Sequence, residues 1–189
     1  MNAREEILGA LRQVDVPDVP KPEVVPSAVP ADLVAAFEAG LESVAGRLVR
    51  VGQLSEIQDD LDERIARGEQ VVCRVDGLRG NREIDDDPRD LGDVDYAVFS
   101  ADWGVAENGA VWVRDESLGH RITPFITEHL GLVLPADRIV ADMHAAMQAI
   151  ELPQARMGVF IAGPSKTADI EQALVIGAHG ACSATVYLV

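Results

Sequence analysis

The segment GPSKTADIE, residues 163–171, has the residue types of an anion-binding turn. Gly163 permits a positive φ or a close backbone approach, Pro164 fixes a turn, and Ser165 and Thr167 offer hydroxyl groups. The unpaired N–H groups of a helix that begins here would also attract an anion. The segment contains neither a Walker A sequence nor a G-x-G-x-x-G sequence, so neither of those phosphate-binding loops is indicated.

Two acids in the same segment indicate a different role, that of a helix cap. Asp169 and Glu171 would lie in the first helical turn, where carboxylates already satisfy the helix dipole, and Asp169 with Gln172 has capping-box spacing. The two carboxylates would repel a phosphate, and Lys166 offsets only one of them. The sequence leaves both interpretations open, a ligand site and a cap.

A second polar turn, within SADWGVAENGAVWV at residues 100–113, has the residues for a carboxylate nucleophile or base. A strand ends at Ser100, Asp102, Glu107 and Asn108 follow it, and Asn108-Gly109 is a turn dipeptide. One interpretation is a hairpin tip with solvated acids. The other places Glu107 at the end of a sheet, where neighbouring apolar side chains partly desolvate it for nucleophilic or base chemistry.

Alternating strands and helices after residue 30 would position both turns. They predict one α/β domain over residues 31–189, with a Rossmann-like, mostly parallel sheet and helices on both faces. The helices are expected at 31–46, 54–68, within 121–131, at 142–152 and at 167–180. The strands are expected at 47–52, at 70–77, twice within 96–114, once or twice within 132–140, at 156–163 and at 184–189. Ser55 and Gly68 are expected to cap and close the second helix, and the apolar runs MGVFIA and ATVYLV suit buried central strands.

Residues 1–30 are expected to form an arm outside this domain. Residues 3–14 predict a short amphipathic helix, with Ile7, Leu8 and Leu11 on one face. Five prolines follow between residues 17 and 30, a spacing that favours an extended polyproline II tether. Because so short a helix is marginal alone, we expect it to pack on its own domain or on a neighbouring subunit.

Charge and composition exclude several classes of partner. The 189 residues carry a net charge of −16, which argues against nucleic acid and against an anionic membrane surface. No apolar stretch is long enough to span a bilayer, and the N-terminal residues lack the apolar core of a secretory signal, so we expect a cytoplasmic protein. A small anionic ligand would need a local site that overcomes the overall repulsion.

The cysteines and histidines give no metal site with recognised spacing. The chain has two cysteines, Cys73 and Cys182, which cannot by themselves hold a four-cysteine iron–sulfur cluster. His179 and Cys182 have a ligand-like separation, but we interpret them as a histidine that flanks a strand and a small buried cysteine. We therefore expect no metal and no intrinsic cofactor.

Both polar turns resemble segments of the lactate utilization protein C family, also called the LUD-domain family. Its members typically show an A-D-x-G-I-A-E-T-G-like segment and a later G-P-S-x-T-A-D-I-E segment followed by G-x-H-G-P. Matching residues here are Asp102, Gly104, Glu107, Gly109, Gly163, Pro164, Ser165, Thr167, Asp169, Ile170, Glu171, Gly177, His179 and Gly180. Asn108 replaces the commoner threonine, and Ala181 replaces the usual proline.

This resemblance, over roughly residues 30–189, implies a sheet of the NagB/RpiA/CoA-transferase type and a role in the oxidation of L-lactate to pyruvate. It implies an accessory subunit without redox centres, beside an iron–sulfur subunit and a second cysteine-rich subunit. It also implies ligand contacts from Asp102, Asn108, Gly109, Gly163, Pro164, Ser165, Thr167, Asp169, Glu171 and His179. A homo-oligomer is compatible with the sequence.

Two other functions stay open. The A-E-N-G turn resembles the S-E-N-G turn of class I CoA-transferases, whose glutamate carries the acyl and CoA groups, so Glu107 would be the nucleophile of a transferase; phosphosugar isomerisation is another activity of this fold. The third alternative is an interaction module with degenerate sites. For the ligand-binding alternatives we expect one pocket at the carboxyl edge of the sheet, with Ser165 and Thr167 contacting the ligand and Glu107 opposite.

Overall fold

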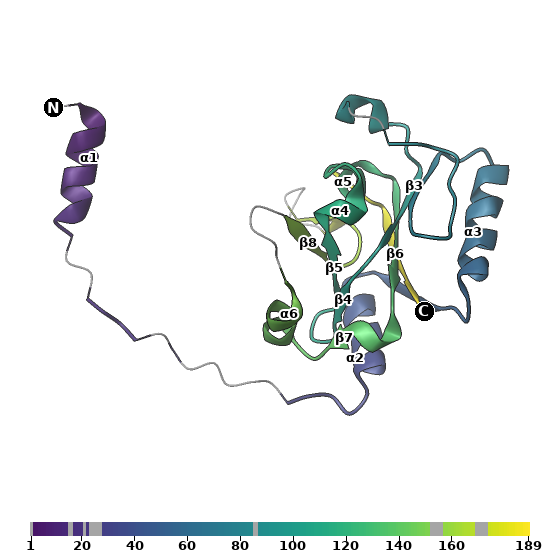
Figure 1. The fold of residues 1–189 in the computed structure, drawn as a ribbon, viewed down its shortest axis with the longest axis horizontal. Helices are drawn as coiled ribbons and strands as arrows, with labels where there is room; N and C mark the ends of the chain where they lie inside the picture. The colour runs from purple at the N-terminus through teal and green to yellow at the C-terminus, as the bar shows by residue number, and fades with distance from the viewer. Residues whose placement is uncertain are drawn as a thin grey trace.

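The computed structural model describes residues 2–14, 17–20, 22, 28–84, 87–151, 157–168 and 174–189. Its α/β domain contains two main sheets and the helices that cover them (Figure 1). The α/β class and the parallel sheet predicted from the sequence are confirmed. Within the described residues, no helix combines the length and the apolarity that crossing a bilayer requires.

The larger sheet has five parallel strands in the order β1-β11-β6-β3-β2. They span Arg47–Arg50 (β1), Val71–Arg74 (β2), Tyr96–Ser100 (β3), His129–Leu134 (β6) and Ser183–Leu188 (β11). Five of the six residues of β11 are buried, as expected for an apolar strand between two parallel neighbours. The prediction of a buried, central C-terminal strand is therefore confirmed.

The second sheet has four strands in the order β7-β4-β5-β8. They span Trp103–Val105 (β4), Ala110–Arg114 (β5), Ile139–Val140 (β7) and Gly158–Ile161 (β8). Two predictions were wrong here. Residues 96–114 form three strands rather than two, because β3 enters the parallel sheet while β4 and β5 pair as a hairpin. The apolar run 157–162 is not central, because β8 pairs antiparallel with β5 at the end of the second sheet and is only half-buried.

Three apolar clusters hold the layers together. Helix α3 (Leu54–Ala66) packs Ile57 and Leu61 against one face of the parallel sheet. Helix α2 (Leu33–Ser43) and the inner face of the second sheet cover the other face. Helix α6 (Met143–Ala149) packs on the outer face of the second sheet. The predicted helices on both sides of the parallel sheet are present, and the second sheet is the layer that the sequence did not predict (Figure 1).

Short helical turns complete the connections. They are η1 (Pro88–Leu91), α4 (Asp115–Leu118), α5 (Thr123–Ile126) and η2 (Ala136–Arg138). The N-cap of α3 is Gln53, not the predicted Ser55, which lies inside the helix. The carboxylate of Glu56 accepts the Gln53 N–H at 3.1 Å and so satisfies one of the donors at this helix end. Gly68 follows α3 with a φ of +91°, as predicted for the residue that closes the helix.

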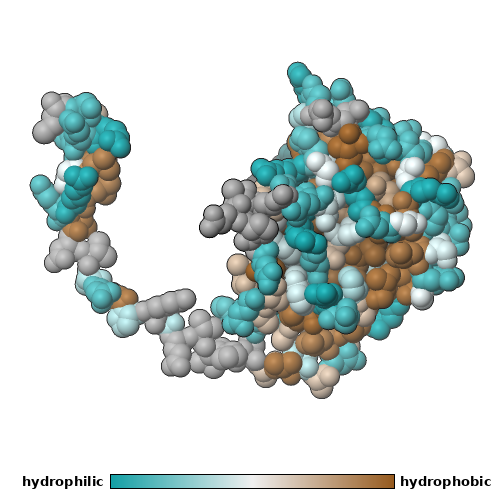
Figure 2. Space-filling view, viewed as in Figure 1, coloured by the Kyte–Doolittle hydropathy of each residue, from teal (hydrophilic) through white to brown (hydrophobic). Residues whose placement is uncertain are grey.

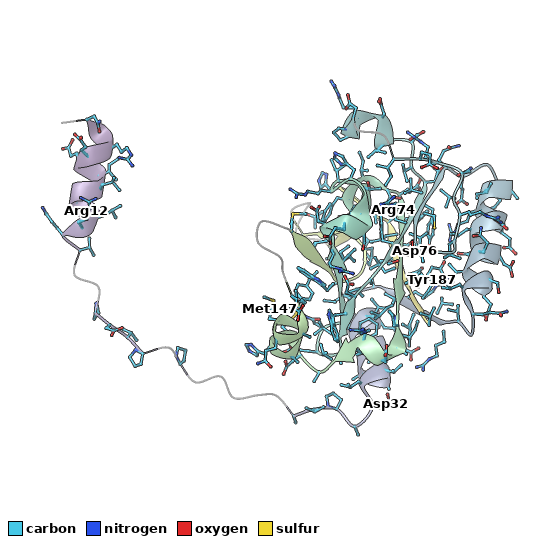
Figure 3. The ribbon with its side chains drawn as sticks, in the orientation of Figure 1. Arg12, Asp32, Arg74, Asp76, Met147 and Tyr187 are labelled. Atoms are coloured by element: carbon cyan, nitrogen blue, oxygen red, sulfur yellow. The ribbon has the colours of Figure 1, made fainter. Side chains whose placement is uncertain are left out.

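A polar network lies beneath α3, on the face of the parallel sheet that this helix covers. The hydroxyls of Tyr96 and Tyr187 lie 3.0 Å apart, and the Tyr187 hydroxyl donates to the carboxylate of Asp60 in α3. Figure 3 labels Tyr187. The guanidinium of Arg64 lies 3.9 Å from the Tyr96 ring centroid. Gly131 makes room for the pair, because a Cβ there would come within 2.5 Å of the Tyr96 hydroxyl. The network therefore satisfies two polar groups that the core buries.

The amino-terminal helix α1 (Ala3–Arg12) confirms the predicted amphipathic segment but does not pack on the domain (Figure 1). None of its residues is buried, and its apolar side chains, among them Ile7 and Leu11, lie exposed along one side (Figure 2). Of the two alternatives left open for this helix, packing on its own domain is therefore not observed. Packing on a neighbouring subunit remains a prediction.

Removal of residues 1–30 is expected to leave the α/β domain as stable as before. Since α1 buries no residue, its loss exposes no core, and the midpoint of thermal unfolding should shift by less than about 2 °C. Calorimetry of the full and shortened chains at several protein concentrations checks this. A concentration-dependent drop confined to the shortened chain would show instead that α1 stabilises an oligomer.

Candidate functional site

The segments around Gly163 and Gly177 lie side by side in a small hairpin. Strands β9 (Lys166–Thr167) and β10 (Val175–Ile176) pair antiparallel, and the N–H of Gly177 donates to the Ser165 carbonyl at 2.9 Å. The helix predicted over 167–180 was therefore wrong for the described residues, because their backbone groups bond across the hairpin. Thr167 lies in a strand and not at a helix N-terminus. The predicted capping and ligand residues Asp169 and Glu171 lie outside the described residues.

The hairpin is fixed to the end of α2 through Gly163 and Lys166. Gly163 has a φ of +70°, and a Cβ at this position would lie 2.2 Å from the Val44 carbonyl oxygen. The Lys166 ammonium donates to the carbonyls of Val44, Ala162 and Pro164 at 2.8, 3.1 and 3.3 Å. Burial lowers the pKa of Lys166. This lysine therefore compensates one carbonyl at the C-terminus of α2 and two of its own segment, and it does not reach toward a ligand.

A cavity of about 240 Å³, here called the hairpin cavity, opens at the base of this hairpin. Its walls are mainly apolar, and its lining includes Phe125, Phe160, Gly163, Pro164, Ser165 and His179. Ser165 and His179 can exchange hydrogen bonds with a ligand. The pocket was predicted at the carboxyl edge of the sheet. The hairpin cavity instead contacts Leu130 near the start of β6 and Ala181 just before β11. It therefore lies at the amino edge of the parallel sheet. The prediction was wrong because β8, the strand that precedes Gly163, belongs to the second sheet.

Glu107 lies in the turn between β4 and β5, where it contacts the start of α6. Its carboxylate accepts the Met143 N–H at 3.1 Å, and its own N–H donates to the Ala141 carbonyl at 3.0 Å. Asn108 accepts the Ala110 N–H at 3.0 Å and so stabilises the turn. This arrangement gives Glu107 a structural role, as a carboxylate at a helix N-terminus.

Asp102 lines a larger cavity of about 470 Å³, here called the carboxyl-edge cavity. It lies where β3 and β6 end, next to Ala101 and Pro135. The Asp102 carboxylate pairs with Arg114 through Nε at 2.9 Å and Nη2 at 2.8 Å. The structure therefore divides the predicted site. Gly163, Pro164, Ser165 and His179 line the hairpin cavity, Asp102 lines the carboxyl-edge cavity, and Glu107, Asn108, Gly109 and Thr167 line neither.

Comparison with known proteins identifies the domain to which both cavities belong. A family model described as the LUD domain matches residues 79–189, which is more than half of the chain. The chain belongs to the LUD domain family. The match begins before β3, and so this LUD domain contains the hairpin and both cavities.

Relatives with curated names match parts of the same chain. The LUD-domain chain is 31% identical over 94 residues to "Lactate utilization protein C 1" of Bacillus mycoides, covering 46% of this chain and 40% of the relative. It is 30% identical over 115 residues to "Lactate utilization protein C" of Anoxybacillus flavithermus, covering 60% and 50%. The chain thus spans half or less of the length of these relatives.

A solved structure shares the fold of this LUD-domain chain. The crystal structure of a DUF162 family protein from Deinococcus radiodurans superposes with a TM-score of 0.60 and covers 84% of this chain and 97% of that protein. The two sequences are 16% identical, so the likeness shows the arrangement of helices and strands alone.

Sequence reasoning missed four side chains of this LUD domain that line the carboxyl-edge cavity, namely Trp103, Trp112, Arg114 and Arg138. Alternation along β5 places Trp112 and Arg114 on one face of the strand, which is a signal the sequence contains. Arg138 follows β6 on a separate turn, so only the tertiary fold brings it to the same place. Among the described residues, no group of three or more His, Cys, Asp and Glu side chains is arranged to hold a metal ion.

Proposed function

We propose that this LUD-domain protein takes part in the oxidation of L-lactate to pyruvate, as a subunit without a redox centre of its own. The observation that carries the proposal is the match to relatives named lactate utilization protein C, through a LUD domain that contains both cavities. The oxidation releases two electrons and two protons, and in this proposal the electrons pass to iron–sulfur and cysteine-rich partner subunits.

The cysteines of the chain support the non-redox role. A four-cysteine iron–sulfur cluster needs four thiolates, and the whole sequence contains two cysteines. Cys73 is half-buried at β2, where burial raises the pKa of its thiol. Cys182 is exposed beside β11, so the expectation that it is buried was wrong. A raised pKa keeps Cys73 protonated and therefore a poor metal ligand or nucleophile.

The hairpin cavity is the part of the domain that we propose to hold a small ligand for this role. Its volume of about 240 Å³ suits a molecule of few heavy atoms. Phe125 and Phe160 would contact the apolar part of such a ligand, and Ser165 and His179 would bond its polar groups.

Growth on L-lactate tests the proposal. A strain lacking this gene should fail to grow on L-lactate as sole carbon source yet grow on pyruvate, and the wild-type gene should restore growth. A double variant, Ser165→Ala with His179→Ala, should restore less growth on L-lactate than the wild-type gene. It removes both of these polar side chains from the hairpin cavity. Undiminished growth of the deletion strain on L-lactate would contradict the lactate role, once other lactate-oxidising enzymes have been deleted.

The alternative, a CoA- or acyl-group transferase that uses Glu107, requires this carboxylate to face a substrate cavity. We expect Glu107→Gln to support growth on L-lactate as well as wild type does, since Glu107 lines neither cavity. The substitution should lower the free energy of unfolding by about 0.5 to 1 kcal/mol, because the amide stabilises the N-terminus of α6 less than a carboxylate does. Urea unfolding measures this. An acyl adduct on Glu107 after incubation with acetyl-CoA, detected by mass spectrometry, would instead favour the transferase.

A further inference from the structure

The carboxyl-edge cavity lies where parallel α/β sheets usually bind ligands. Ala101 follows β3 and Pro135 follows β6, and these two strands are neighbours in the sheet. Ligands in open α/β sheets bind outside the carboxyl ends of such strands. The volume of about 470 Å³ is within the range of small-molecule sites.

Two guanidinium groups line this cavity and retain unused donors. The Arg138 guanidinium lies 5.0 Å from the ring centroid of Trp103 and forms no ion pair within the described part of the chain. Asp102 holds Arg114 by its Nε and Nη2, and no hydrogen bond to the described residues occupies its Nη1. A guanidinium presents planar, paired N–H donors that match the oxygens of carboxylates and phosphates.

The acids of the cavity do not cancel this arrangement. Asp102 is paired with Arg114, so it orients the guanidinium and its own charge is balanced. Glu151 is exposed at the end of α6, where water screens its charge, and in the described residues it forms no ion pair. Among the described residues, Arg138 is therefore the cation of the cavity that no carboxylate neutralises directly. In a chain with a net charge of −16, such a group is where an anion would be retained.

Two tryptophans line one wall of the cavity, and a phenylalanine on the same face of the second sheet packs against one of them. Trp103 and Trp112 are directly opposite in the β4–β5 pairing, so their side chains lie on the same face of the second sheet. The Trp112 ring packs against Phe160 with 4.7 Å between centroids. Gly158 makes room for it, since a Cβ there would come within 2.0 Å of the indole. The result is an aromatic patch beside the two arginines.

We propose that the carboxyl-edge cavity binds a small organic anion, a carboxylate or a phosphate monoester with a short apolar body. Arg138 and Arg114 donate to the oxyanion, and the body lies on the indoles of Trp103 and Trp112. Asp102 is a positioning residue for Arg114. The proposal uses only this cavity and does not depend on a role in lactate utilization, so the growth experiment above neither supports nor contradicts it.

Tryptophan fluorescence gives a direct readout, because the chain has two tryptophans and both line this cavity. The probes are benzoate, phenyl phosphate and benzamide, which present the same ring with a carboxylate, a phosphate or no charge. Both anions should change the emission saturably, with Kd values below about 10 mM, and benzamide should not. The anion with the lower Kd identifies the preferred head group. An equal response to benzamide, or no saturable response to either anion, would overturn the proposal.

A matched pair of arginine variants assigns the binding to this place. Arg138→Gln should weaken binding of the preferred anion at least about tenfold, as expected when a charge-assisted hydrogen bond is lost. Arg89→Gln removes the same charge from an exposed residue of η1 that does not line the cavity, and should leave the Kd unchanged. Equal weakening in both variants would show a general charge effect and contradict the site. Arg138 is exposed, so thermal unfolding should confirm that its variant remains folded.

Discussion

Replacement of Gly109 by alanine is expected to lower the free energy of unfolding by about 3 to 5 kcal/mol. Gly109 has a φ of +67°, which costs a residue with a Cβ free energy, and its Cβ would lie 2.2 Å from the backbone nitrogen of Leu41. Neither backbone can move easily, because Gly40 in the same helix also requires the absence of a side chain: a Cβ there would lie 2.8 Å from the Gly109 nitrogen. Accommodating one methyl group would therefore separate α2 from the second sheet.

Urea unfolding of Gly109→Ala measures this loss, and Gly68→Ala is its matched control. Gly68 has a φ of +91°, but a Cβ there meets no atom within 4 Å. In the control, the free energy of unfolding should therefore decrease only by the cost of the positive φ, about 1 kcal/mol. If the two variants were equally stable, the close packing of the turn on α2 would not be the reason for the glycine. Gly109 matches the family segment and was predicted to contact a ligand. In the structure, the close packing of its turn on α2 explains why this residue is a glycine.

The free energy of unfolding is expected to decrease steeply in alkaline solution, by about 2 to 3 kcal/mol from Tyr96 alone. Burial raises the pKa of Tyr96 to about 12, and burial also raises the pKa of Tyr187. In the unfolded chain both phenols have a pKa of about 10. The folded state therefore favours the protonated phenols. Their contribution is complete below about pH 10 and is lost as the pH rises through the folded pKa values.

The chain has two tyrosines, so the ultraviolet absorbance of tyrosinate reports on this pair alone. Both phenols should stay protonated at pH 11, about one unit above the unfolded pKa, for as long as the protein remains folded. Urea unfolding of Tyr96→Phe should show a weaker dependence on pH above about pH 10 than the wild type. Normal titration of either tyrosine in the folded protein would contradict the buried network.

Local patterns in the sequence located most helices and strands of the domain. The periodicity of α2 and α3 and the apolar run of β11 are local, and each was found close to its observed bounds. Strand β4 was missed because three residues, Trp103–Val105, give too short a pattern to recognise. The hairpin of β9 and β10 was taken for a helix because its acids and small residues also suit a helix start, and two-residue strands leave no alternation to detect.

The candidate site was harder to predict because its parts come together through long-range pairing. The apolar run of β8 suits a central strand equally well, and only its pairing with β5 shows that it belongs to a second sheet. For this reason the hairpin cavity lies at the amino edge of the parallel sheet and not at the carboxyl edge, where it was predicted. Glu107 likewise has the residue type of a nucleophile, and its contact with Met143, far along the chain, shows that it stabilises a helix.

The order of strands in the parallel sheet has a consequence for the synthesis of the protein. Strand β11 lies between β1 and β6, so β1 has no neighbour in the sheet until residues 183–188 have left the ribosome. The early part of the chain must therefore wait with an unpaired strand edge, which is a hazard for aggregation. Pairing over so many intervening residues also predicts slow folding. A nascent chain stalled before β11 should thus depend on chaperones that cover apolar surface.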